Sequence, residues 1–344
     1  MVFYNDSALS WFVNDYILDR ECSLFPLVFN FSHSDGYVIA AKKLGLKLIG
    51  ENEIKEIYQG GKRIGELNGM VSDLVSKEAI KTLKQKSIVQ TLLNKAGVNI
   101  PKFKSFTSDD KGYQTAFNFW SEQAYSGYVI KPSDARAGEG ITIGVQDEES
   151  FATAWNYAKT SLSNPQSEIL LEERITGIDV RVLVVGDQAV CATARIPAYV
   201  IGDGVSNVDK LVHDKNKLRS KHPHHKRYLI SISNYANSLD YIPKNREVLF
   251  LSNKANIHQG GEAIDVTNLI SDKIKSNAIH AAKSIPGNLV CGVDLMVSDF
   301  EKDEGKVIEM NSHANFGIHY YPMYGVSRNP AEAVLKLMMI KNAE

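Results

Sequence analysis

The sequence has few cysteines and almost no net charge. Its 344 residues include three cysteines, Cys22, Cys191 and Cys291, which lie far apart and form no paired metal-binding or redox spacing. A sparse, odd number of cysteines is typical of a reducing compartment, so we expect a cytoplasmic protein. The formal net charge of −1 at pH 7 gives no electrostatic reason to bind nucleic acid or an anionic membrane.

Long apolar runs and two common nucleotide-binding motifs are absent as well. No apolar run approaches the roughly 20 residues that a membrane-spanning helix needs. The N-terminal segment MVFYNDSALSWFVNDYILDR contains acids but no basic n-region, which is untypical of a signal peptide. Neither a GxxxxGK(S/T) phosphate loop nor a GxGxxG dinucleotide motif occurs. With 44% hydrophobic and 23% charged residues, the chain has the composition of a globular protein with several lobes.

Short apolar runs divide the chain into blocks. Residues 1–80 show an α/β pattern, with strand-like runs at 24–31 and 46–49 around a helix-like stretch at 36–44. Apolar residues at helical spacing predict one helix over 77–96, which Gly97 ends. Strand runs and helix runs in separate blocks favour an α+β fold. The later predicted strands span 127–131, 141–145, 169–175, 181–185, 190–196, 289–297 and 306–310, and the later predicted helices span 148–158, 267–285 and 327–340.

Three polar residues stand out in the two C-terminal strand-like runs. Asp294 lies between apolar neighbours in VCGVDLMV, and Glu309 and Asn311 lie in KVIEMN. Because side chains alternate across a strand, Glu309 and Asn311 share one face, and Asp294 joins them if the two strands pair as a hairpin. Three oxygen ligands suit Mg²⁺, which usually shares its shell with phosphate. A single such acid would be read as an edge residue that reaches water, but the trio favours a metal site.

A second candidate region surrounds a glycine-containing loop. Lys131 ends the run GYVIK, and Gly138 and Gly140 follow, where backbone N–H groups can approach phosphate oxygens. A solvated strand end and a plain hairpin are the alternatives for these residues. Downstream, LEERITGID places two acids at a strand end before Gly177 and Asp179. This pattern is compatible with a hinge that meets adenine and ribose, although the spacing alone does not establish one.

Taken together, these residues resemble the ATP-grasp superfamily, and most of all the ATP-grasp part of cyanophycin synthetases and of bifunctional glutathione-forming enzymes. The resemblance extends from about Lys86 to the C-terminus, and the order and spacing of its segments make it specific. The matching segments are KSIVQTLLNKAGVNIP, YVIKPSDARAGEGITI, LLEERITGIDVRVLVVGDQAVCATARIPAYVIGDGVSN, NIHQGGEAIDVT, CGVDLMV and VIEMNSHANFGIHYYP. It implies two α+β lobes that grip ATP: a small lobe over 81–173 and a large lobe over 174–344, after a small N-terminal α/β domain over 1–80.

The resemblance also implies roles for individual residues. Lys86 and Lys131 would contact the ATP phosphates, and Arg195, assisted by Arg181, would lie near the acyl phosphate and its tetrahedral intermediate. The other residues implied at the nucleotide are Ser133, Gly138 and Gly140 in the closing loop, Glu172, Glu173, Arg174 and Ile175 at adenine, and Asp179 at ribose. Asp294, Glu309 and Asn311 would hold Mg²⁺. The candidate substrate residues are His258, Gly260, Gly261, His313, His319 and Tyr320, with hydrogen bonding or packing as the alternative for the last three.

Some positions depart from the family pattern. Gln85 stands where the family often has Asp, and the glycine loop carries Arg136 and Glu139. The substrate loop SHANFGIHYYPMYG has its own sequence, which leaves the substrate open.

The polar segment 203–246 contains the run KHPHHKR. We predict a loop followed by a surface helix. The predicted surface histidines in this run are His222, His224 and His225.

The expected function is an ATP-dependent carboxylate–amine ligase. ATP and Mg²⁺ would convert a carboxylate to an acyl phosphate, and an amine would then form the amide, with amino acids or short peptides as substrates. No general base is evident from the sequence. The alternatives are an ATP-grasp kinase, which needs no amine, and a non-catalytic nucleotide-binding module. Dimerisation is common in the resembled family, so a homodimer is compatible with the resemblance.

Overall fold

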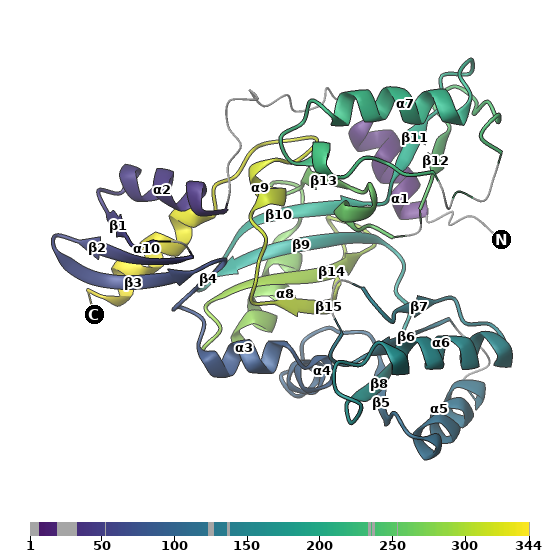
Figure 1. Cartoon of the computed structure of the whole chain (residues 1–344), viewed down its shortest axis with the longest axis horizontal. Coiled ribbons are helices and arrows are strands. Elements are labelled where there is room, and N and C mark those ends of the chain that lie inside the picture. Colours follow the sequence, from purple (N-terminus) through teal and green to yellow (C-terminus); the bar gives the residue numbers. More distant parts are fainter. Residues whose placement is uncertain are drawn as a thin grey trace.

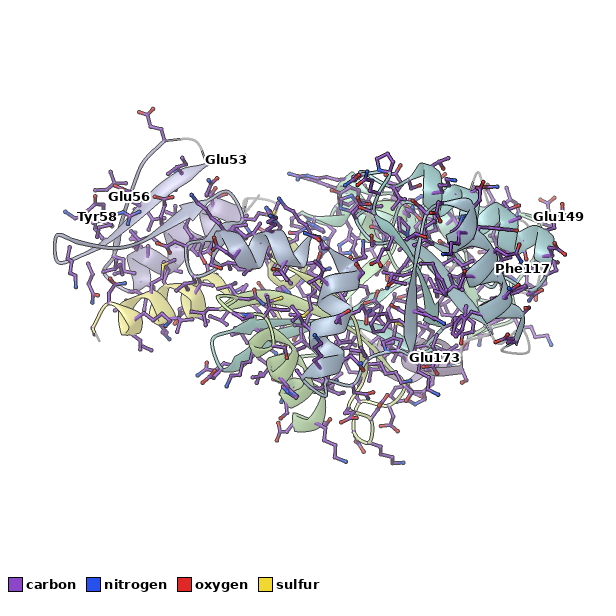
Figure 2. All side chains as sticks on the ribbon, turned by 90° about the horizontal axis from the view of Figure 1, so that it is seen from below. Glu53, Glu56, Tyr58, Phe117, Glu149 and Glu173 are labelled. Carbon is purple, nitrogen blue, oxygen red and sulfur yellow. The ribbon has the colours of Figure 1, made fainter. Side chains whose placement is uncertain are left out.

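The computed structural model describes residues 7–18, 33–51, 53–122, 127–135, 138–232, 235, 238–252 and 254–343. Within them the backbone forms an N-terminal sheet, a small sheet, a large sheet and a two-stranded ribbon, with helices packed against them (Figure 1). The predicted α+β class is confirmed. The N-terminal sheet, with Glu56 and Tyr58, lies at one end of the molecule, and Phe117 and Glu149 lie at the other (Figure 2). Cys22, Arg136 and the predicted strand at 24–31 lie outside the described residues.

The N-terminal sheet is covered by helices from both ends of the chain. Its strands, in the order β1-β2-β3-β4, are β1 (Lys47–Ile49), β2 (Ile54–Gln59), β3 (Lys62–Asn68) and β4 (Val71–Ser72). The helices α2 (His33–Lys43) and α10 (Ala331–Lys341) pack together against it. The helix predicted at 36–44, the strand predicted at 46–49 and the helix predicted at 327–340 are confirmed as α2, β1 and α10. The strands β2 to β4 are not anticipated by the sequence pattern. The short helix α1 (Ser7–Phe12) continues into a π-helical turn (Val13–Ile17) and packs Phe12 against Phe300.

The single helix predicted over 77–96 is wrong, because the structure has two helices there. The first is α3 (Lys77–Leu83) and the second is α4 (Lys86–Lys95). Gln85 between them is extended, with φ −114° and ψ 91°, and the backbone N–H of Lys86 donates to the carbonyl of Ser133 at 2.8 Å. Helical spacing continues across the break, so the pattern could not reveal it. The break starts α4 at Lys86, beside the glycine loop.

The small sheet has the order β5-β8-β6-β7 and its own apolar core. The large side chains of this core include Trp120, Phe151 and Trp155. The strands are β5 (Phe103–Thr107), β6 (Tyr128–Pro132), β7 (Thr142–Ile143) and β8 (Glu168–Glu173), and the helices are α5 (Asp110–Glu122) and α6 (Glu148–Thr160). Asp147 caps α6: its carboxylate accepts the backbone N–H of Ser150 at 2.8 Å, which satisfies a free amide of the first turn. Helix α5 is not anticipated.

The large sheet has the order β13-β10-β9-β14-β15 and is packed on one face by α8 (Asp272–Lys283). Its strands are β9 (Ile178–Val185), β10 (Gln188–Ile196), β13 (Glu262–Asp265), β14 (Val290–Val297) and β15 (Lys306–Asn311). The hairpin that groups Asp294 with Glu309 and Asn311 is confirmed as β14 and β15, and β9 and β10 form a second antiparallel pair. In β9 the apolar side chains of Val180 and Val182 are fully buried and alternate with Asp179 and Arg181, so the opposite face of the sheet is polar.

The prediction for residues 203–246 is wrong in both its order and its burial. Helix α7 (Val208–Arg219) precedes the histidine run and lies near the ribbon of β11 (Tyr199–Ile201) and β12 (Val248–Phe250). His222 and His225 are buried rather than at the surface. The cause is a distant charge: Arg219 and Glu262 are both fully buried and paired at 3.2 Å, which holds the end of α7 against β13.

The described chain contains two of the three cysteines. Cys191 and Cys291 are buried free thiols. Among the described helices, none is both long and apolar enough to cross a bilayer. The domain boundaries near 80 and 173 stay a prediction.

Replacing Glu262 with Gln is expected to lower the free energy of unfolding by about 3–5 kcal/mol. The substitution leaves Arg219 and Lys215, which bind Glu262 at 3.2 and 3.1 Å, without a buried counter-charge. Urea unfolding at pH 7.5 measures the difference. The matched control is Asp214→Asn, which removes an exposed carboxylate that pairs with Lys210 on α7 and should cost less than about 1 kcal/mol. Equal losses in the two variants would contradict the argument.

Burial lowers the pKa of His222 to about 4, against about 6.5 in an unfolded chain. Between these two values the unfolded state binds a proton that the folded state does not, so stability falls as the pH falls through this window. His222→Asn should therefore reduce the loss of unfolding free energy between pH 7.5 and pH 5 by about 2 kcal/mol. The exposed His213→Asn serves as the control and should leave that loss unchanged.

Candidate active site

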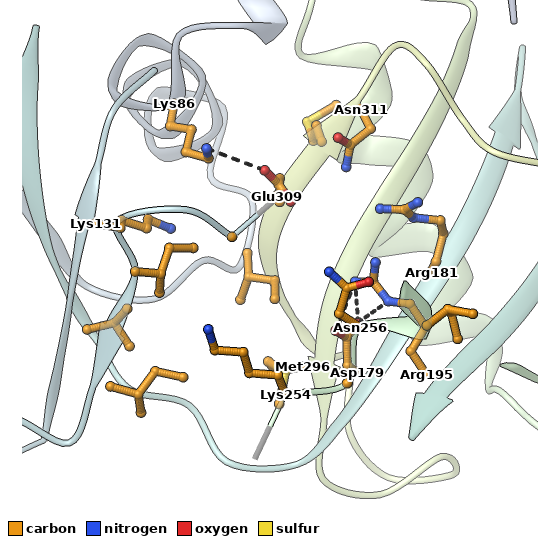
Figure 3. Close-up of a pocket in the computed structure, with 18 of the residues that line it drawn as sticks. Lys86, Lys131, Asp179, Arg181, Arg195, Lys254, Asn256, Met296, Glu309 and Asn311 are labelled. Atoms are coloured by element: carbon orange, nitrogen blue, oxygen red, sulfur yellow. Dashed lines mark hydrogen bonds and ion pairs between the residues drawn. The ribbon is translucent and has the colours of Figure 1, made fainter. Parts of the chain in front are cut away.

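The small and large sheets contribute residues to one cavity of about 980 Å³. Figure 3 shows lysines from the small-sheet side facing charged residues of the large sheet. The predicted site residues that line this cavity are Lys86, Lys131, Gly138, Glu172, Glu173, Arg174, Ile175, Asp179, Arg181, Arg195, His258, Glu309, Asn311 and His313. The structure thus brings together residues from all the segments on which the sequence prediction relied.

Strand register sets the charges of the large sheet in rows. Asp294 lies opposite Arg181 of β9 and opposite Glu309 of β15, so one row crosses three strands. In the neighbouring row Asp179 lies opposite Arg195 of β10. Directly opposed residues on antiparallel strands share a face, so these five side chains lie on the same face of the sheet.

Asp294 is the most enclosed charge of this face, with 1% of its side chain exposed. Arg181 donates to both of its carboxylate oxygens, at 2.6 and 2.7 Å, and an Arg195 nitrogen lies 2.9 Å from Oδ2. Burial alone would raise the pKa of Asp294, but the two guanidinium groups outweigh it and hold the pKa below its usual value. Asp294 is therefore an ionised carboxylate that two arginines already bind.

Asp179 is a second carboxylate on this face of the sheet, and its partner is Arg195. It accepts hydrogen bonds from Arg195 at 2.6 and 2.8 Å. Burial raises the pKa of Asp179, and the nearby charge of Asp294 adds to the rise although Arg195 opposes it. Its predicted ribose contact thus competes with an ion pair.

The small-sheet side supplies two lysines that already have carboxylate partners. Lys131 binds Glu172 at 2.6 Å, and both side chains are largely buried. Gln90 also donates to Glu172, at 2.8 Å. Lys86 lies 3.6 Å from Glu309 and donates to the carbonyl of Ala135. The Glu172 side chain is therefore engaged with Lys131 and Gln90, so we expect the neighbouring backbone to offer the better contact for adenine.

The residues predicted to hold Mg²⁺ lie together. Glu309 keeps 40% of its side chain exposed, Asn311 lines the cavity, and the Asn311 amide lies 3.4 Å from Asp294. No three His, Cys, Asp or Glu side chains in the described chain gather as a metal cage. Mg²⁺ is usually bound by one or two carboxylates together with substrate phosphates, and Glu309 with Asn311 fits that pattern.

Other predicted residues are absent from the cavity lining: Ser133, Gly140, Gly260, Gly261, Asp294, His319 and Tyr320. His319 is buried and its Nδ1 lies 2.7 Å from the Thr193 hydroxyl, and Tyr320 is packed among aromatic rings. Gly140 and Gly260 both have positive φ, 72° and 89°, and an added Cβ would meet neighbouring atoms at 2.7 and 3.0 Å. These glycines have a structural reason to be present, whatever their role toward a ligand.

Sequence reasoning missed several residues that do line the cavity: Leu9, His224, Lys254, Asn256 and Asn315. Asn256 accepts the backbone N–H of His258 at 3.0 Å and so supports a predicted substrate residue. A signal existed for Asn256, which is the first residue of the matching segment NIHQGGEAIDVT, for Lys254, which lies two residues before it, and for Asn315, which lies inside the substrate loop. Leu9 is an ordinary apolar helix residue and carries no such signal.

The chain resembles known proteins over the same segments. Residues 84–197 match the family model described as phosphoribosylglycinamide synthetase, ATP-grasp (A) domain. The glutathione biosynthesis bifunctional protein GshAB of Clostridium perfringens is 32% identical over 272 residues, which are 74% of this chain and 34% of that protein. Its counterpart from Pasteurella multocida is 32% identical over 275 residues, 74% of this chain and 35% of the relative.

A solved structure supports the same relationship. The crystal structure of a bifunctional glutathione synthetase from Pasteurella multocida superposes with a TM-score of 0.64 at 25% identity, over 90% of this chain and 44% of that one. The chain therefore spans about a third of the length of the curated relatives that it matches. The predicted fold and the predicted likeness to glutathione-forming enzymes are confirmed. The chain belongs to the ATP-grasp superfamily.

Proposed function

We propose that this chain joins the carboxylate of an amino acid or short peptide to an amine, through an acyl phosphate, with release of ADP and phosphate. The relatives are named as glutathione biosynthesis proteins, so γ-glutamylcysteine and glycine are the first carboxylate and amine to test. The proposal extends to Mg²⁺ as the metal. A cytoplasmic location and a homodimer are also part of it, and they rest on the sequence and the family alone.

The observation that carries the proposal is the opposition of charges across the cavity. Lys86 and Lys131 lie on one side, and Glu309, Arg181 and Arg195 lie on the other (Figure 3). Attack of a carboxylate on the γ-phosphate brings anions together, so the reaction needs fixed cations around the transferring group. Four cationic side chains, Lys86 of α4, Lys131 of the small sheet, and Arg181 and Arg195 of the large sheet, meet that need.

Glu309 and Asn311 would hold Mg²⁺ together with phosphate oxygens, and Asp294 lies next to both. The metal, when bound, neutralises charge on the transferring phosphoryl group. Arg181 and Arg195 bind Asp294 in the absence of ligand, and the same donors are suited to an acyl phosphate. If a phosphate anion bound Arg181 and Arg195 in place of Asp294, the Asp294 carboxylate would be free to bind the metal.

The nucleotide end of the cavity is lined by Glu173, Arg174 and Ile175. The strand β8 ends at Glu173, and the N–H groups of Glu173 and Arg174 donate to the carbonyls of Lys102 and Gly127 at 2.8 and 3.0 Å. The backbone beyond them, around Ile175, is therefore the part of this segment proposed to hydrogen-bond an adenine edge. Ser133 to Gly140 is proposed as the closing loop, with Gly138 at the cavity. Closure would keep water from the acyl phosphate, which hydrolyses readily.

The test is release of ADP and phosphate from Mg-ATP with γ-glutamylcysteine and glycine, singly and together, and then with a panel of amino acids and short peptides. We expect release only when a carboxylate and an amine are both present, with an amide product detected by mass spectrometry. Glu309→Gln should lower kcat/KM by about 100-fold or more, because it removes a charge that orders the phosphate end.

The matched control is Glu304→Gln, an exposed acid on the turn between β14 and β15, which should leave kcat/KM unchanged. Transfer of phosphate to a hydroxyl compound without an amide product would identify a kinase instead. Binding of ATP without release of ADP under every substrate pair would identify a nucleotide-binding module.

A further inference from the structure

The histidine run after α7 sends one side chain into the cavity. His224 lines it, although the run belongs to a segment outside both facing sheets. The ring centroid of His224 lies 5.5 Å from that of His225 and 5.9 Å from that of Tyr228, both in edge-to-face contact. Its backbone N–H lies 3.3 Å from the Nδ1 of His222. Neighbouring residues of the same turn thus hold the imidazole in place.

The imidazole of His224 has no hydrogen-bond partner among the described residues. Its Nδ1 is buried and unpaired, so the edge of the ring that can meet a ligand carries Nε2. This Nε2 lies beside Gly317, where an added Cβ would come within 3.1 Å of Nε2 and 2.9 Å of Asn315 Oδ1. A buried polar atom without a partner costs about 1–3 kcal/mol, and in His224 this atom is Nδ1, on the side of the ring away from a ligand.

The electrostatic surroundings keep this imidazole neutral. Burial lowers the pKa of His224 to about 4, and His222, Arg227, His258 and Arg219 act in the same direction. None of these groups is a carboxylate. A neutral ring with its proton on Nδ1 would present a lone pair on Nε2 to the cavity.

We propose that His224 contacts the amine substrate and accepts its proton during amide formation. The amine nitrogen forms a bond to the acyl carbon, and the C–O bond to phosphate breaks with its electron pair leaving on phosphate. The proton of the amine passes to Nε2 of His224 and from there to phosphate or solvent. This inference rests on the ligase function proposed above and supplies the base that the sequence did not reveal.

The test compares two amines in wild type, His224→Gln and His224→Asn. The reaction contains Mg-ATP, γ-glutamylcysteine and either glycine or hydroxylamine, which is largely neutral at pH 7 and needs less help to lose a proton. Both variants keep an amide that can hydrogen-bond, at the position of Nε2 or of Nδ1, but neither can take up a proton. We expect kcat/KM for glycine to fall about 100-fold or more, with at least about a tenth of the rate kept for hydroxylamine.

His213→Gln on the exposed face of α7 is the control and should behave as wild type with both amines. Thermal unfolding of each variant shows that it is folded. Equal losses with glycine and hydroxylamine, or no loss with either, would overturn the role of His224 as proton acceptor while the amide product still supports the ligase. If wild type releases ADP without any amine and forms no amide, the ligase proposal itself fails, and this inference fails with it.

Discussion

Asp294 is a carboxylate in the middle of a sheet, at a point where water scarcely reaches it. An isolated charge in that position would be very costly, and two guanidinium groups offset the cost. Arg181 is aligned for this because it lies directly opposite on β9, and Arg195 because it lies in the next row on β10. The order of the charged face therefore depends on one buried ion-pair cluster, which the strand register places.

Other cations that line the cavity are also paired with carboxylates. Lys131 is paired with Glu172, Lys86 approaches Glu309, and Arg195 also binds Asp179. In this state each of these cations already has a carboxylate nearby, so the cavity holds many charges without a large local imbalance. In the proposed reaction a polyphosphate would enter by exchange, with its oxygens replacing carboxylates as partners of the same donors. Such an exchange would also free Glu309 and Asp294 to bind the proposed metal.

Much of this site could be predicted because its residues follow strand alternation. Asp294, Glu309 and Asn311 occupy the same face of a hairpin with a short connection, and period-two alternation together with the family pattern was enough to group them. A local sequence pattern does not predict which distant residue will pair with a buried charge. The pairing of Asp294 with two arginines therefore could not be foreseen.

The parts that sequence reasoning missed share one physical cause. Gln85 breaks a continuous helical pattern because Lys86 donates its backbone N–H to Ser133, nearly fifty residues away in the chain. The polar, basic run around His222 reads as a surface because its neighbours are charged, yet Arg219 finds Glu262 on β13 and carries the run inward. Both cases are decided by a contact between remote residues. The charged face of the large sheet is built from paired strands, whereas the residues proposed to meet the substrate lie in turns that such remote contacts position. The local sequence pattern therefore constrains the proposed substrate residues least.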